Sequence, residues 1–423
     1  MNDYKKIFNI AFINLFLVIF GYFLTGRLGQ GILPLSKFIR ISFLLYSFYV
    51  LNKIVPFRTI RDNYSSRNLF TVFLILILVS SVLANYPMYV LSKLLVSIPS
   101  VMFTIVFINT AFSKLGLETT KILLLRLFIS CFSIPLFFSI VFNGNYYLGK
   151  NLYGIEWNVT ADNYTNDGFL SNHLAWSSII VFSSSIAYLG ITKLTKSKKI
   201  VLYFLMLFSV MTIINSGSRT ILVALIVYFI VLLIKNILLR SNLIKPLALT
   251  FFLIFVLSKI NLHNLESVKS LIFRTNVHLY NQENFARFSY LASGLKVFDE
   301  NPITYLIGIG LFNKKAISDM NITFFSGHRG TRNVSNFHNS YADILFGGGI
   351  IVFLIFVYLA LLKSLRQLWK YNDKYFLLVI PLHLIALTES SLQGGQFIFY
   401  PLFYFICVSN LKCLNISSRI KPI

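Results

Sequence analysis

The middle of the chain reads LSNHLAWSSIIVFSSSIAYLGI (Leu170–Ile191), TKLTKSKK (Thr192–Lys199) and IVLYFLMLFSVMTIIN (Ile200–Asn215). The two apolar runs each approach the length of about 20 residues that a helix needs to cross a bilayer. The lysines between them are typical of a cytoplasmic loop. The pattern predicts two membrane-spanning helices joined on the cytoplasmic side.

The same alternation extends over the whole chain. Windows of about 19 apolar residues give twelve candidate spans, near 7–25, 38–56, 69–86, 92–112, 121–142, 170–192, 200–216, 220–239, 245–260, 346–363, 374–389 and 393–412. The first run lacks a small-residue cleavage signal, so we expect it to be a retained span.

The composition agrees with this pattern. Of 423 residues, 56% are hydrophobic and only 12% are charged, whereas soluble domains have roughly 45–50% and about 25%. With 43 phenylalanines and a mean hydropathy of +0.73, the chain has more apolar surface than one core could hide. We therefore expect an all-α polytopic membrane protein with about 12 transmembrane helices.

The charge pattern predicts the orientation of the helices. The net charge of +24 is concentrated in short Lys and Arg clusters between apolar runs, which is a topology signal and not a nucleic-acid footprint. Clusters in every second loop place both termini in the cytoplasm. The three cysteines, Cys131, Cys407 and Cys413, have no metal-site spacing, and we expect no metal or cofactor.

The predicted organisation has three parts: residues 1–260 with nine transmembrane helices, 261–345 as a large extracytoplasmic loop, and 346–423 with three helices and a cytoplasmic tail. Apolar residues at helical spacing from Phe285 to Phe298 predict an amphipathic helix in the loop. Gly308 and Gly310 indicate a tight turn or a close backbone approach after it.

Two outward-facing arginines are candidates for binding an anion. Arg219 follows the small-residue break Asn215–Ser218, and Arg287 lies beside the apolar face of the loop helix. A guanidinium can grip phosphate through two hydrogen bonds. The alternatives are an Arg219 that snorkels to the outer headgroups and an Arg287 that is solvated or bound to headgroups.

Histidines supply the candidate bases. His338, just before the glycine run that opens the tenth span, can act as a general base near neutral pH, with ordinary polar surface as the alternative. Asp343 is five residues on, so the spacing does not imply an Asp–His pair. His383 lies inside a predicted span, where packing is favoured over proton transfer.

The order of these motifs resembles one family. Ser218-Arg219 begins a helix, Arg287 precedes Asn301-Pro302 and Gly308-x-Gly310, and His338-Asn339 precedes the glycine run 347–349. This order is similar to that of the O-antigen ligase and polymerase superfamily of bacterial envelope polysaccharide assembly. The resemblance implies a metal-independent glycosyltransferase with a GT-C-like helical fold in the bacterial cytoplasmic (inner) membrane.

The resemblance also implies roles for individual residues. Arg219 and Arg287 would hold the diphosphate of an undecaprenyl diphosphate-linked oligosaccharide, and His338 would activate the acceptor hydroxyl on the outer face. Supporting candidates are Asn339, Asp343, His328, Arg329 and His173. Membrane lipid, a chain-length regulator and a flippase are the implied partners.

Three functions remain open. A polymerase moves the growing chain onto the next lipid-linked repeat unit, whereas a ligase moves finished polymer onto lipid A-core. Ligases of the family often carry a second histidine two residues before the first, and this chain has Asn336 there, which favours a polymerase. A lipid-linked oligosaccharide transporter is the third reading, but it would place charged residues in the middle of the bundle.

Overall fold

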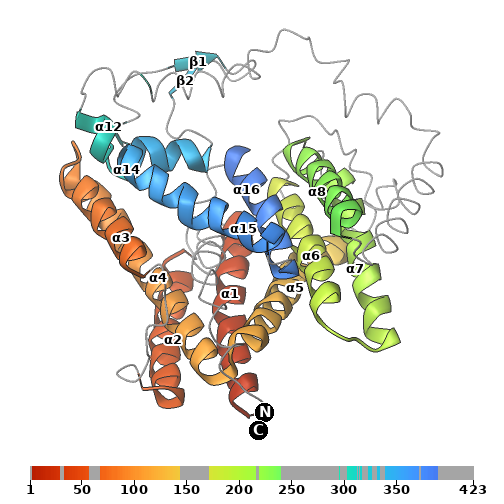
Figure 1. Ribbon diagram of the computed structural model, residues 1–423. Helices are drawn as coiled ribbons and strands as arrows, with labels where there is room; N and C mark the ends of the chain where they lie inside the picture. The colour runs from red at the N-terminus through yellow and green to blue at the C-terminus, as the bar shows by residue number, and fades with distance from the viewer. Residues whose placement is uncertain are drawn as a thin grey trace. The chain divides into compact units, whose positions relative to one another are not determined.

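The computed structural model describes residues 2–28, 33–56, 67–142, 171–215, 219–239, 295, 303–311, 313, 315–316, 323–325, 331–333, 339–370 and 373–388. Nearly all regular structure in these ranges is helical (Figure 1). The chain divides into two compact units. The first comprises Met1–Ser47, Glu118–Asn276 and Leu368–Ile385, and the second comprises Phe48–Leu117, Val277–Gln367 and Ala386–Ile423.

The first unit is built around one buried helix. Its elements are α1 (Asn2–Leu28), the first part of α2 (Leu33–Ile54), nearly all of α5 (Leu117–Phe142), α6 (Ser171–Ile191), α7 (Lys196–Asn215), α8 (Arg219–Leu239), the 3-10 helix η7 (Lys374–Leu378) and most of α16 (Val379–Thr388). Every residue of α6 from Ala175 to Tyr188 is buried, and α6 contacts α7, α8 and η7. Its many serines suit this central place, because small side chains let helices approach closely.

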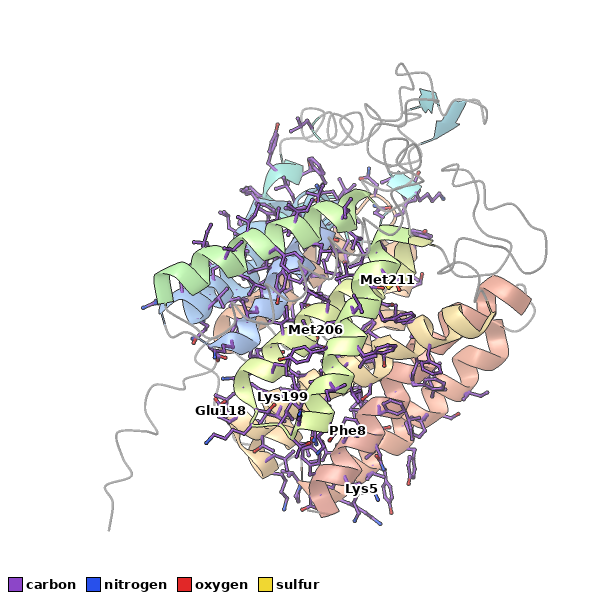
Figure 2. The ribbon with its side chains drawn as sticks, turned by 90° about the vertical axis from the view of Figure 1, so that its right-hand side faces the viewer. Lys5, Phe8, Glu118, Lys199, Met206 and Met211 are labelled. Atoms are coloured by element: carbon purple, nitrogen blue, oxygen red, sulfur yellow. The ribbon has the colours of Figure 1, made fainter. Side chains whose placement is uncertain are left out.

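One end of the first unit is rich in charge. Arg126 of α5 donates to the Tyr188 hydroxyl of α6 at 2.7 Å and to the Tyr4 hydroxyl of α1 at 3.2 Å. The start of α1, the first half of α5 and the end of α6 therefore lie together. Figure 2 shows Lys5, Glu118 and Lys199 towards this end, with Met206 and Met211 further along α7.

The second unit packs α14 against the end of α3. Its elements are the rest of α2, α3 (Arg67–Val82), α4 (Pro87–Leu115), α12 (Ile303–Ile307), strands β1 (Thr323–Phe325) and β2 (Thr331–Asn333), α14 (Ser340–Phe356), the π-helix η6 (Val357–Leu362) and most of α15 (Lys363–Lys370). Its core contains Ile77, Leu311, Tyr341, Ile344, Val352, Phe356, Leu359, Ala360 and Ala386. Tyr341 packs edge-on against Phe356, with ring centroids 5.5 Å apart.

A short antiparallel strand pair departs from the expected all-helical pattern. Thr323 pairs with Asn333 and Phe325 with Thr331. Strands of three residues are too short to produce a detectable alternation of polar and apolar side chains, so the pair could not be predicted from the sequence. His328 and Arg329 fall between the two strands, outside the described residues.

Ten of the twelve predicted spans coincide with helices of the structure, and the other two, 245–260 and 393–412, lie outside the described residues. Within the described residues, two helices are long and apolar enough to cross a membrane, Leu117–Phe137 and Ser340–Trp369. Shorter apolar helices are Ile41–Ile54, Val72–Val82, Met102–Leu115, Ala175–Ile191, Ile221–Ile234 and Lys374–Leu387. The mostly helical fold is confirmed, and the count of twelve membrane crossings stays a prediction.

Candidate active site

The start of α14 is fixed by an asparagine cap. The Asn339 Oδ1 accepts from the backbone N–H of Tyr341 at 2.9 Å and of Ala342 at 3.1 Å, and Asn339 itself is extended, with φ −152° and ψ 115°. The helix therefore begins at Ser340, six residues before the predicted start of the span at 346. The Asn339 side chain satisfies the first backbone N–H groups of the helix, and a search for apolar windows does not detect such a cap. Of the supporting candidates, Asn339 thus has a structural role.

The predicted base, His338, immediately precedes this cap. His338 itself lies outside the described residues. The described helix end that follows it, at Asn339 and Ser340, carries partial positive charge, as any helix N-terminus does, and favours nearby anions.

Asp343 lies in the first turn of the same helix. Its backbone N–H donates to the Asn339 carbonyl at 2.8 Å, and its side chain is fully buried. A carboxylate in the first helical turn is favoured by the helix dipole. Whether Asp343 pairs with His338 stays a prediction.

A glycine turn ties α12 to α14. Gly308 and Gly310 both have positive φ, 73° and 93°. In this turn, the Ile309 N–H donates to the Phe346 carbonyl and the Gly310 N–H donates to the Gly347 carbonyl, each at 2.9 Å. The tight turn and close backbone approach predicted from the two glycines are confirmed.

Arg219 is the first residue of α8, so the predicted helix start is confirmed. Buried residues of α8 recur at helical spacing, at Ile221, Ala224, Leu225 and Tyr228, and this face packs on α6 and α7. The side chain of Arg219 lies outside the described part of the structure.

His173 lies in the first turn of α6. The connections between α6, α7 and α8 are short, residues 192–195 and 216–218. Three consecutive helices joined this way alternate in direction. The starts of α6 and α8, with His173 and Arg219, are therefore at the end of the first unit away from Lys199.

Most of the remaining site candidates lie in parts of the chain that the structure does not describe. Arg287, His328 and Arg329 lie outside the described residues, as does the predicted loop helix except for Leu295, which is helical and exposed. His383 is buried in α16, in agreement with a packing role. Among the described residues, no three His, Cys, Asp or Glu side chains are close enough to hold a metal ion.

A buried ion pair lies at the opposite end of the first unit. Lys121 Nζ is 2.6 Å from Asp373 Oδ2 and 2.9 Å from Glu118 Oε1, and the Lys121 side chain is only 3% exposed. Lys121 belongs to the Lys and Arg clusters that predict cytoplasmic loops, and Asp373 is not among the candidate residues predicted from the sequence. Asp373 is the only acidic residue in the basic stretch 363–374, and this isolated acid is the one sequence feature that could have indicated an ion pair there.

The described residues form a mostly helical fold, and two of its helices are long and apolar enough to cross a membrane. Residues 204–357 match the family model described as O-Antigen ligase. The match supports the O-antigen ligase/polymerase superfamily, which the order of motifs predicted. Members of this family are membrane-integral, glycosyltransferase-like enzymes that use a lipid-linked polysaccharide substrate. No curated protein matches the chain.

Proposed function

We propose that this protein is a polysaccharide polymerase that joins undecaprenyl diphosphate-linked repeat units, of the O-antigen or capsular type, on the outer face of the bacterial cytoplasmic membrane. The observation that carries the proposal is the family match over residues 204–357, a range that contains Arg219, Arg287 and His338. Asn336, in the place of a second histidine, favours polymerase over ligase.

The chemistry assigns each residue one task. His338 takes the proton of the acceptor hydroxyl, whose oxygen attacks the anomeric carbon of the donor sugar. The bond from that carbon to the lipid diphosphate breaks, and the electron pair leaves with the diphosphate oxygen. Arg219 and Arg287 stabilise the charge that develops there, which is greater in the transition state than in the ground state.

Contacts within each unit support the proposed topology. In the first unit, the first half of α5 contacts the start of α1 and the end of α6 through Arg126, and the start of η7 through Lys121. The starts of α1, α5 and η7 and the end of α6 are all predicted cytoplasmic ends. In the second unit, Ser80 near the end of α3 contacts the first half of α14, and both are predicted outer ends. This arrangement favours an outer location for His338.

A ligase is the second candidate, because the matching family model is itself described as O-Antigen ligase. The donor, the leaving group and the roles of the three residues would be the same. The acceptor alone would differ, being lipid A-core in place of another carrier-linked repeat unit.

The test is genetic complementation with glycan sizing. A deletion strain receives wild type, His338→Ala, Arg219→Ala or Arg287→Ala at matched membrane levels, with Lys198→Ala, an exposed lysine at the other end of the first unit, as the control. Surface and carrier-linked glycans are then sized by gel and mass spectrometry.

We expect single repeat units in the deletion strain and in the three site variants, and polymer with wild type and the control. Full-length polymer that accumulates on the lipid carrier would establish the ligase instead. Repeat units trapped on the inner face would contradict both transferases and indicate a transporter.

A further inference from the structure

Helix α14 is broken in its middle. Gly349 has φ 80° and ψ 173°, which lie outside the helical region, so α14 consists of two pieces joined at a kink. The kink lies inside Ser340–Trp369, one of the two segments long and apolar enough to span a membrane. A break in such a segment is tolerated only where protein satisfies the backbone groups that lose their helical partners.

The structure supplies those partners from two other elements. Just before the kink, the Phe346 carbonyl accepts from Ile309 N–H at 2.9 Å, and the Gly347 carbonyl accepts from Gly310 N–H at 2.9 Å. The Gly347 carbonyl also accepts from Ser80 Oγ of α3 at 2.7 Å. Carbonyls that a break withdraws from the helix are thus bonded to the turn after α12 and to α3.

Glycine is required for this approach. A Cβ on Gly308 would overlap the Gly347 carbonyl, and a Cβ on Gly349 would overlap the Leu306 carbonyl of α12. A Cβ on Gly310 would lie 2.8 Å from Ala84 Cβ. Gly308, Gly310 and Gly349 also have positive φ, a backbone conformation that residues with a Cβ rarely adopt. We call Gly308, Gly310, Gly347, Gly349 and Ser80 the glycine clasp.

The clasp joins the two chain segments that carry the proposed outer-loop residues. On one side, the segment bearing Arg287 continues into α12 and the turn at Gly308. On the other side, the Asn339 cap, which follows His338 in the sequence, begins the first piece of α14. Displacement of a reacting group by about 1 Å can cost roughly a hundredfold in rate, so a rigid junction here has a direct kinetic value.

We propose that the glycine clasp is the positioning device of the transfer site, with Gly308 and Gly349 as positioning residues. They hold the first piece of α14 against α12 and the turn at Gly308, and they do not touch the substrate. This inference rests on the proposed transferase function, because it assigns the clasp to that same site.

The test uses full-length protein in nanodiscs with Gly308→Ala, Gly349→Ala and the milder Ser80→Ala, which removes one hydrogen bond without any overlap. The matched control is Gly116→Ala. Gly116 also has positive φ, 75°, but a Cβ there would meet nothing within 4 Å, so the substitution strains the backbone without opening the clasp.

Transfer kinetics are measured with a purified undecaprenyl diphosphate-linked repeat unit. We expect kcat to fall about a hundredfold in Gly308→Ala and Gly349→Ala and about tenfold in Ser80→Ala, with KM within about twofold of wild type. Gly116→Ala should retain wild-type kcat per folded molecule. A clasp that only stabilised the fold would lower the folded fraction in all variants and leave kcat per folded molecule unchanged, which would overturn the proposal.

A distance measurement separates the clasp from the function. Spin labels are placed at Tyr305→Cys on α12 and Leu362→Cys on η6, both exposed, in a background with the three native cysteines replaced by alanine. We expect one narrow distance distribution in wild type and Gly116→Ala, and a broader one in Gly308→Ala.

A broad distribution in Gly308→Ala together with wild-type kcat would overturn the positioning role. A wild-type protein with the narrow distribution and no transfer to carrier-linked or lipid A-core acceptors would instead contradict the proposed function.

Discussion

Lys121 Nζ lies 2.6 Å from Asp373 Oδ2, which joins the start of α5 to the start of η7 within the first unit. Asp373 has a second task, because its Oδ1 accepts from Tyr375 N–H at 3.1 Å and caps η7. Breaking a buried pair by removing one partner leaves the other charge without compensation, which costs more than the pair itself contributes.

Lys121→Met should therefore destabilise the protein by about 3 kcal/mol. Asp373→Asn combined with Lys121→Met should recover most of this loss, because the remaining amide oxygen still caps η7 and no buried charge is left. Unfolding of detergent-solubilised protein measures both, with Lys198→Met, an exposed lysine, as the control. Equal losses in Lys121→Met and Lys198→Met would show that the ion pair contributes nothing.

Asn339 offers a test that separates capping from contact with the substrate. Asn339→Ala removes the acceptor for two backbone donors and should lower stability by about 1 kcal/mol together with polymer yield. Asn339→Ser restores the cap with a hydroxyl and should restore both. Complementation with glycan sizing provides the readout. A serine variant that is stable yet inactive would show that the asparagine amide itself is needed at the site.

The sequence was sufficient for the features that depend on local pattern. The apolar windows located α1 to α8, and the small-residue break before Arg219 located the start of α8, because helix length and hydrophobicity are properties of single segments. Gly308 and Gly310 predicted a tight turn or a close backbone approach for the same reason, because a position with positive φ favours glycine whatever lies elsewhere in the chain.

Other features depended on contacts between distant segments. Nothing near Lys121 in the sequence indicates that Asp373, 252 residues away, is its partner. Likewise, the sequence does not indicate that the glycine turn packs on the broken helix α14. Only the structure shows this contact, through the hydrogen bond from Gly310 N–H to the Gly347 carbonyl. The candidate site could be assembled from motif order, but its supporting framework required the fold.

If His338 is the general base, activity should depend on pH with a definite sign. The neutral imidazole accepts the acceptor's proton, so log(kcat/KM) should rise with slope one on the acidic side and level off once the imidazole is neutral. His338→Ala should lose this limb together with most of the rate. Arg219→Lys should lower the rate at every pH and keep the shape of the profile. A profile that is identical in wild type and His338→Ala would remove His338 as the base.

The stereochemistry of the product tests the whole assignment of roles. With His338 on one face of the sugar and the two arginines on the leaving diphosphate, a single displacement inverts the anomeric carbon, so an α-linked lipid donor should give a β-linked product. NMR coupling constants of the disaccharide junction formed by purified protein distinguish the two configurations. The control is the same junction in repeat units incubated with His338→Ala, where no new linkage should form. A product of retained configuration would require a covalent sugar–enzyme intermediate, and His338 could then no longer act only as a base on the acceptor.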